Sequence, residues 1–139
     1  MIAFDTNALV RMLVEDDPDQ AKIVDDVVTL VEKNSGQIII LTEVLIETVW
    51  VLESVYHCTR KEIYQFLEAL ISTSAFTFGE ASVIRTAISQ YRRGGDFADL
   101  VIVNQARRLQ AKKLVSFDKK LQKRFPGYVV DSIKVDVDL

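Results

Sequence analysis

Four acidic residues of this chain stand at unusual places. Two of them end or follow an expected strand, and two lie among apolar residues of expected helices, where an ionised carboxylate costs free energy. Asp5 ends an apolar segment that begins at Ile2, and Asp118 directly follows the apolar segment 113–117. Glu47 and Asp99 each lie one helical turn from apolar side chains, on or beside an expected buried face. Ionised carboxylates in such surroundings are costly unless they are paired or bound to a metal. Neither Glu47 nor Asp99 has a basic residue within one turn, which favours a bound cation over a buried salt bridge.

A cation would also explain how four carboxylates come to share one place. Two carboxylates about 4 Å apart repel by about 4 kcal/mol at an effective dielectric of about 20. The chain has one histidine, His57, and one cysteine, Cys58, so a histidine or cysteine metal cluster is not expected. Ligand sets made only of oxygen select hard cations such as Mg²⁺ or Mn²⁺. Water bound to such a metal attacks phosphate, so the acids predict hydrolysis with one or two metals.

Local structural roles compete with this interpretation. Asp is a favoured N-cap, so Asp5 and Asp118 could each simply begin a helix. Asp96 and Glu43 lie one helical turn before an assigned acid, and either could hold a second metal or its water. For these two we favour the local roles, an N-cap for Asp96 and a first-turn charge for Glu43.

Strand and helix patterns alternate along the chain and predict how the acids are positioned. Short apolar segments predict strands at 2–5, 38–41, 75–78, 113–117 and 128–130. Helices are expected at 8–14, from Asp17-Pro18, at 42–56, from the capping box Thr59 and Glu62, and at 80–93, 96–110 and 118–125. This order is typical of an α/β fold, with helices on both faces of a central parallel sheet of four to five strands. Ligands bind at the carboxyl ends of such strands, where Asp5 and Asp118 are expected.

Composition sets the broad class of the protein. The 139 residues are 49% hydrophobic with a net charge of −3, which predicts one folded domain over residues 1–139 and no binding to nucleic acid through overall basicity. We expect no membrane span, because polar residues interrupt every apolar stretch, and no signal peptide at the start. A single cysteine suits a reducing compartment, so the expected location is the cytoplasm.

Four short motifs resemble those of the PIN-domain nucleases, and most closely the VapC toxins of toxin–antitoxin pairs. They are Phe4-Asp5-Thr6-Asn7-Ala8-Leu9-Val10, Glu47 with Val49-Trp50-Val51-Leu52, Asp96-Phe97-Ala98-Asp99-Leu100, and Ser116-Phe117-Asp118-Lys119-Lys120-Leu121. The resemblance implies a three-layer α/β/α PIN-like fold and an Mg²⁺- or Mn²⁺-dependent endoribonuclease that inhibits translation as a type II toxin. Asp5, Glu47, Asp99 and Asp118 would be the catalytic acids that bind the metal. Asn7 and Ser116 would orient an acid or a water, and Ser116 replaces the more usual threonine.

The resemblance also implies partners: an RNA substrate, a small antitoxin that reaches the acidic pocket, and a second copy in a homodimer. Candidate RNA contacts are basic residues near the motifs, and the same residues could equally form a solvated face. They are Arg11, Arg92, Arg93, Arg107, Arg108, Lys112, Lys119, Lys120, Lys123 and Arg124. Lys119 and Lys120 directly follow Asp118, so they could hold phosphates close to the metal.

Other families account less well for the same residues. A phosphatase of the haloacid dehalogenase type needs a second Asp at the position of Asn7, and a receiver module needs an acceptor Asp where Phe78-Gly79-Glu80 stands. A catalytically silent PIN-like interaction module is the strongest alternative to an enzyme. The presence of all four acids counts against it.

Overall fold

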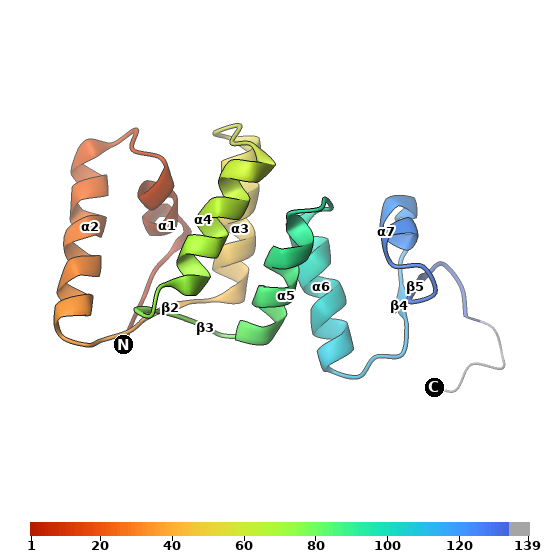
Figure 1. Ribbon diagram of the computed structural model, residues 1–139. Helices are drawn as coiled ribbons and strands as arrows, with labels where there is room; N and C mark the ends of the chain where they lie inside the picture. Colours follow the sequence, from red (N-terminus) through yellow and green to blue (C-terminus); the bar gives the residue numbers. More distant parts are fainter. Residues whose placement is uncertain (134–139) are drawn as a thin grey trace.

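The computed structural model describes residues 1–133, and residues 134–139, which the single-domain prediction also covers, lie outside the described part. Strands and helices occur in the predicted order (Figure 1). They are β1 (Ile2–Ala3), α1 (Thr6–Leu13), α2 (Pro18–Lys33), β2 (Ile38–Ile40), α3 (Thr42–Ser54), α4 (Arg60–Ser72), β3 (Phe76–Phe78), α5 (Ala81–Tyr91), α6 (Phe97–Arg108), β4 (Leu114–Val115), α7 (Lys119–Arg124) and β5 (Val129–Val130). The predicted boundaries hold to within a few residues.

Helix caps explain several of these boundaries. The Asp17 side chain accepts a hydrogen bond from the backbone N–H of Gln20 and begins α2, with proline next to it at Pro18. At the start of α4, Thr59 and Glu62 exchange the two hydrogen bonds of a capping box. Both caps confirm predictions that needed only neighbouring residues.

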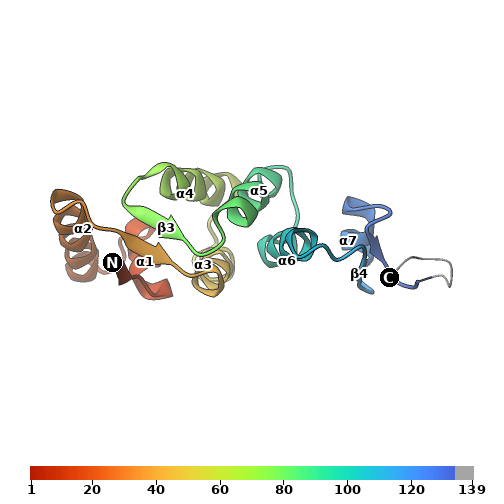
Figure 2. The same cartoon turned by 90° about the horizontal axis from the view of Figure 1, so that it is seen from below.

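The first three strands form one parallel sheet in the order β1-β2-β3. Ile38 in the central strand lies opposite Ile2 on one side and Phe76 on the other, and it is fully buried. Seen from below, α4 and α3 lie on opposite sides of β2 and β3 (Figure 2). Parallel strands joined by helices confirm the α/β class of the PIN type.

The last two strands pair with each other in a second parallel sheet instead of extending the first. The chain leaves α6 through Gln110, whose φ of 66° turns it away, and β4, α7 and β5 then lie at the far end of the molecule from β1 (Figures 1 and 2). The five predicted strands are therefore present, but they are divided between a three-stranded and a two-stranded sheet. We call residues 1–108 the body and residues 114–130 the C-terminal segment.

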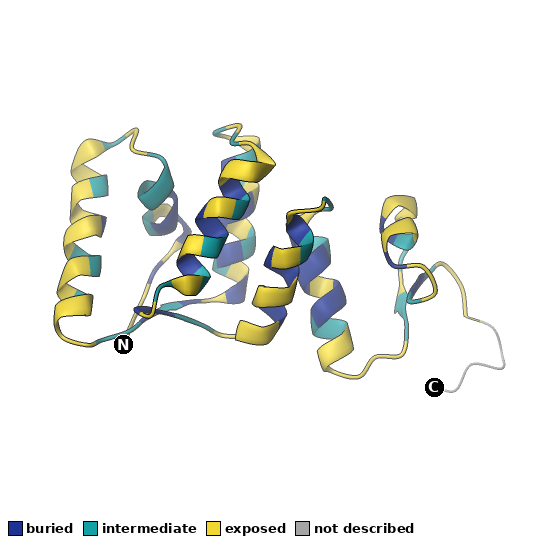
Figure 3. Ribbon diagram, in the orientation of Figure 1, coloured by how far each residue is buried: buried dark blue, intermediate teal, exposed yellow. Residues whose placement is uncertain are grey.

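Buried residues concentrate on the inner faces of the body helices (Figure 3). Tyr91 of α5 and Phe97 at the start of α6 are fully buried and meet edge to face, with ring centroids 5.8 Å apart. The C-terminal segment buries fewer side chains, and Arg107 of α6 lies over its Phe125 and Tyr128 rings at 5.5 and 4.6 Å. Within residues 1–133, no helix is both long and apolar enough to cross a membrane.

Candidate active site

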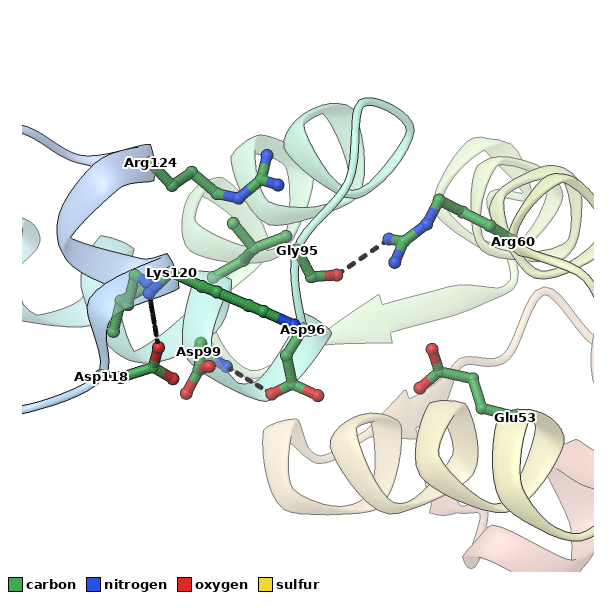
Figure 4. A pocket seen from close by; sticks show the side chains of 10 residues that line it. Glu53, Arg60, Gly95, Asp96, Asp99, Asp118, Lys120 and Arg124 are labelled. Carbon is green, nitrogen blue, oxygen red and sulfur yellow. Dashed lines mark hydrogen bonds between the residues drawn. The ribbon is translucent and has the colours of Figure 1, made fainter.

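Two of the four predicted acids, Asp99 and Asp118, face one pocket of about 450 Å³ between the body and the C-terminal segment (Figure 4). Acidic side chains from α3, α6 and the start of α7 share this pocket with basic side chains from α4 and α7. The lining residues are Glu53, Arg60, Gly95, Asp96, Asp99, Leu100, Asp118, Lys120, Leu121 and Arg124. We call it the acidic pocket.

Asp99 stands in the first turn of α6, where the helix begins at the N-cap Asp96. Its backbone N–H donates to Asp96 Oδ2 at 3.1 Å, which confirms the local role predicted for Asp96. Partial burial raises the pKa of the Asp99 carboxyl, and the negative charges of Asp96 and Asp118 raise it further. A positive charge close to Asp99 would therefore favour its ionised form.

Asp118 reaches the same pocket from the C-terminal segment and also caps α7. Its Oδ1 accepts hydrogen bonds from the backbone N–H groups of Lys120 and Leu121 at 3.0 and 3.1 Å. The Ser116 hydroxyl accepts from the Asp118 backbone N–H at 3.1 Å, which ties the predicted accessory serine to this acid. Capping and a role in the pocket are therefore compatible, because the cap uses only one carboxylate oxygen.

Three basic side chains offset the acids of the pocket. Lys120 and Arg124 extend from α7 above the acids in Figure 4. Arg60 lies over the Tyr91 ring at 4.3 Å and donates to the backbone carbonyls of Tyr91 and Gly95 at 3.0 and 2.8 Å. Arg60 thereby fixes the loop before Asp96, whereas Lys120 and Arg124 give the pocket positive charge beside its carboxylates.

Glu53 is an acid that the sequence analysis did not single out. It accepts a hydrogen bond from the Tyr91 hydroxyl at 3.0 Å and lines the acidic pocket. Burial, with a smaller contribution from the Glu53 charge, raises the pKa of Tyr91 well above its usual range, so Tyr91 stays a donor. Tyr91 stands 38 residues further along the chain, so no local pattern signals this pair.

Glu47 and Glu43 lie on α3 beside a second pocket of about 440 Å³, which also touches Glu53 and Asp96. The prediction that Glu47 flanks a buried face is wrong, because its side chain is exposed and its neighbour Trp50 is 60% exposed. Of the apolar residues one turn from Glu47, Val44 and Val51 are partly buried and Trp50 is exposed, so they do not make the position of Glu47 a buried one.

Asp5 occupies the N-cap position of α1, yet its side chain makes no capping hydrogen bond. Both Asp5 and the nearby Asn7 are exposed, and Asp5 lines neither of the two pockets described above. Residues 1–133 contain no group of three or more acid, histidine or cysteine side chains placed to hold one metal ion. One chain as described thus brings Asp99 and Asp118 together without Asp5, and the four-acid metal set stays a prediction.

Several of the basic residues predicted to contact RNA have partners inside the chain. Arg11 donates to Asp16, Gln20 and Tyr56 at 2.8, 2.9 and 3.2 Å. Other contacts join Lys119 to Asp131, Arg92 to the Tyr64 ring and Arg108 to Glu80. Arg93 is exposed. Among the five strongest candidates (Arg11, Arg92, Arg93, Lys119 and Lys120), Lys120 is the residue that lines the acidic pocket.

Comparison with known proteins decides the family. The model of the PIN domain matches residues 2–126, from β1 to just beyond α7, and so covers all four motifs. The chain belongs to the PIN-domain family. A curated relative is the "VapC ribonuclease" of Aquifex aeolicus (strain VF5), 34% identical over 82 residues. This similarity covers 58% of the chain and 61% of the relative, so the chain spans about three fifths of that protein. No solved structure matches the chain.

Proposed function

We propose that this PIN-domain protein is a metal-dependent endoribonuclease that hydrolyses RNA phosphodiester bonds. The observation that carries the proposal is the acidic pocket, where Asp99 and Asp118 from distant parts of the sequence face one cavity beside Lys120 and Arg124. The similarity to a protein named a ribonuclease supports RNA as the substrate. The single-domain prediction for residues 1–139 is part of this proposal, supported by the family match over residues 2–126.

The basic side chains of the pocket are suited to hold the RNA backbone. Lys120 and Arg124 stand on α7 beside Asp118, so a phosphate bound by them would lie close to the acids. Phosphate binding by such residues weakens as salt concentration rises. The expected substrate affinity is therefore salt-dependent, although the chain as a whole is acidic.

The metal belongs to the proposal as Mg²⁺ or Mn²⁺, because the predicted ligands offer only oxygen atoms. Asp5, Glu47, Asp99 and Asp118 are the proposed ligands. Within residues 1–133, no three acids lie close enough together to hold one metal ion.

The decisive experiment compares cleavage of a labelled RNA by the wild type, Asp99→Asn and Asp26→Asn, each with Mg²⁺ or Mn²⁺ and with EDTA. Asp99→Asn removes a charge from the acidic pocket and is expected to lower the cleavage rate about 100-fold or more. Asp26→Asn is the matched control, since Asp26 is an exposed acid of α2 that pairs with Lys22. Full cleavage by Asp99→Asn would contradict the site. A wild type that never cleaves RNA would favour the silent interaction module.

We further propose that the protein acts in the cytoplasm as the toxin of a type II toxin–antitoxin pair and inhibits translation. Its support is the similarity to a VapC protein, together with a single cysteine that needs no oxidising compartment. Expression of the wild type should arrest growth, and co-expression of a cognate antitoxin should restore it. Harmless expression of an enzyme that cleaves RNA in vitro would contradict the toxin role and leave the nuclease intact.

A further inference from the structure

The β1 strand has one edge that no strand of the described residues pairs. The backbone N–H groups of Ile2 and Phe4 donate to Gln37 and Ile39, at 3.0 and 3.2 Å, on the side of β2. Successive N–H groups of a strand point to opposite edges. The N–H groups of Ala3 and of the residue two positions after it therefore point to the other edge of β1. No strand of the described residues lies beyond that edge. An open edge of this kind is a template for another strand.

The β4 strand has an open edge of the same kind. Its Leu114 and Ser116 N–H groups donate to Tyr128 and Val130, at 3.0 and 2.9 Å, on the side of β5. The N–H groups of Val115 and of the residue two positions after it consequently point to the edge that β5 leaves uncovered. One chain thus carries two unpaired edges, both on strands that already pair in parallel on their other side.

Apolar side chains are exposed along both edges. Val115 is 50% exposed, Phe117 is 80% exposed and Ile2 is 44% exposed. Burial of apolar surface stabilises by about 25 cal/mol per Å². If the two edges paired with each other, these side chains would lie beside one another and would be less exposed to water.

We propose that β4 of one copy pairs in parallel with β1 of a second copy, and that the exchange is reciprocal. Within one chain, β1 and β4 lie at opposite ends of the molecule (Figures 1 and 2). A second copy can present its β1 edge to β4 without any change in the described conformation. The two contacts are equivalent, as in a two-fold symmetric dimer that exchanges an element. Each half of the dimer then contains a continuous five-stranded parallel sheet.

The hydrogen-bonding directions fit a register that places Asp5 of one copy opposite Asp118 of the other. In this register the outward N–H of Phe117 meets the outward carbonyl of Ala3. Both acids directly follow their strands, and parallel strands have their carboxyl ends at the same edge of a sheet. The exposed Phe117 is also placed beside the second copy's β1, where it is less exposed to water.

Pairing of this kind brings an acid of the second copy to the acidic pocket. Asp118 and Asp99 come from one chain, and Asp5 arrives from the other. Within residues 1–133, the Thr6 hydroxyl is the buried side-chain polar atom without a hydrogen-bond partner, and it stands directly after Asp5. The end of β1 therefore lacks a polar partner in the single chain. This consequence for catalysis rests on the proposed nuclease function, whereas the strand pairing does not.

The first test measures oligomeric state by light scattering after size-exclusion chromatography. The wild type is expected at twice the 15.8 kDa mass of one chain. Val115→Pro removes the N–H that points to the open edge and leaves the bonds to β5, so it should give a folded monomer. Val115→Thr keeps that N–H and should stay a dimer. A monomeric wild type, or a dimeric Val115→Pro, overturns the proposal.

The second test does not depend on a proline variant that folds. Cysteines replace Ile2 and Val115 in a Cys58→Ser background, because neighbouring strands lie about 4.8 Å apart, within disulfide range. Oxidation should give a covalent dimer. Val115→Cys combined with Leu30→Cys, an exposed position on α2, should give none. A disulfide within one chain would mean that β4 folds back onto its own β1, and this outcome, like no disulfide at all, overturns the proposal.

The third test asks whether two chains share a site. Asp5→Asn and Asp118→Asn are expected to be inactive alone, but their co-expressed heterodimer contains one site with both acids intact. With random pairing, half of the dimers are mixed, and about a quarter of the wild-type activity should return. No recovery overturns the shared site. An inactive wild type, or an active Asp5→Asn, counts against the proposed function instead, while the cross-link still reports the pairing.

Discussion

The body and the C-terminal segment differ in how completely they bury their apolar side chains. The body packs fully buried leucines from several helices, among them Leu9, Leu45, Leu67 and Leu100. The C-terminal segment buries Leu121 and Phe125 less completely, and its outer strand edge is open. Asp99 belongs to the body and Asp118 to the segment, so the acidic pocket depends on the contacts that hold the segment against the body.

The largest expected effect comes from a cavity in the body. Leu45→Ala should destabilise the folded state by about 2–5 kcal/mol, because Leu45 is fully buried and its truncation leaves a void. Leu121→Ala should cost less and should act mainly on the segment. Thermal unfolding measures the first effect, and hydrogen exchange of residues 114–130 measures the second. Equal global destabilisation by both variants would mean that body and segment unfold as one unit.

A smaller effect is expected from the contact that joins the two regions. Arg107 lies over the rings of Phe125 and Tyr128, and such cation–π contacts stabilise by about 0.5–2 kcal/mol. Arg107→Met keeps much of the aliphatic packing and removes the charge. We expect faster hydrogen exchange in the C-terminal segment and lower RNase activity, with little change in the unfolding of the body. Arg85→Met, at an exposed position of α5, is the control. Unchanged exchange in Arg107→Met would show that other contacts hold the segment.

The sequence predicted features that depend on near neighbours. The Asp17 cap, the Thr59 and Glu62 capping box and the apolar strands are encoded within a few residues, and they occur as expected. The division of the sheet was not predicted, because strand pairing joins residues far apart in the chain. Alternating strands and helices cannot distinguish a β4 that pairs with β1 from one that pairs with β5.

The acids show the same limit. Asp99 and Asp118 were expected together and both line the acidic pocket, since Asp99 lies in the first turn of a predicted helix and Asp118 directly follows a predicted strand. Glu47 was expected beside the core and is exposed, because apolar neighbours on a helix do not reveal whether that face is covered. Glu53 was missed because its partner, Tyr91, comes from another helix.

A further difference is expected between two acids of the body, Asp99 and Glu62, in how they respond to pH. In the folded state the pKa of Asp99 is raised, by burial and then by Asp96 and Asp118, above its usual value of 3.8. The charge on Asp99 therefore destabilises above that raised pKa, and the penalty disappears as pH falls below the unfolded value. Asp99→Asn should have a higher melting temperature than the wild type at pH 7, with the gap closing towards pH 3.5.

Glu62 gives the opposite sign and serves as the control. Hydrogen bonds with the Thr59 backbone and side chain lower the pKa of Glu62 below 4.5. Its stabilisation is present above the unfolded pKa and is lost as pH falls through the folded value. Glu62→Gln should therefore lower the melting temperature at pH 7 and match the wild type in acid. A melting temperature of Asp99→Asn below that of the wild type at pH 7 would contradict the repulsion within the acidic pocket.

The smallest effect on stability is expected from an ion pair between the C-terminal segment and the residue that directly follows it. Lys119 and Asp131 form an exposed ion pair at 3.0 Å, and such pairs contribute only about 0–1 kcal/mol. Asp131→Asn should thus leave the melting temperature nearly unchanged, yet it releases a lysine next to Asp118.

If that lysine then contacts phosphate, RNA should bind more tightly at low salt, and the slope of log affinity against log salt should steepen by about 0.7 for one added contact with a single strand. Asp26→Asn breaks a comparable pair with Lys22 on α2, far along the chain from the pocket, and should leave the slope unchanged. The same steepening in both variants would reflect net charge alone. A steepening confined to Asp131→Asn would place the RNA backbone on the C-terminal segment, because only that variant frees a cation there.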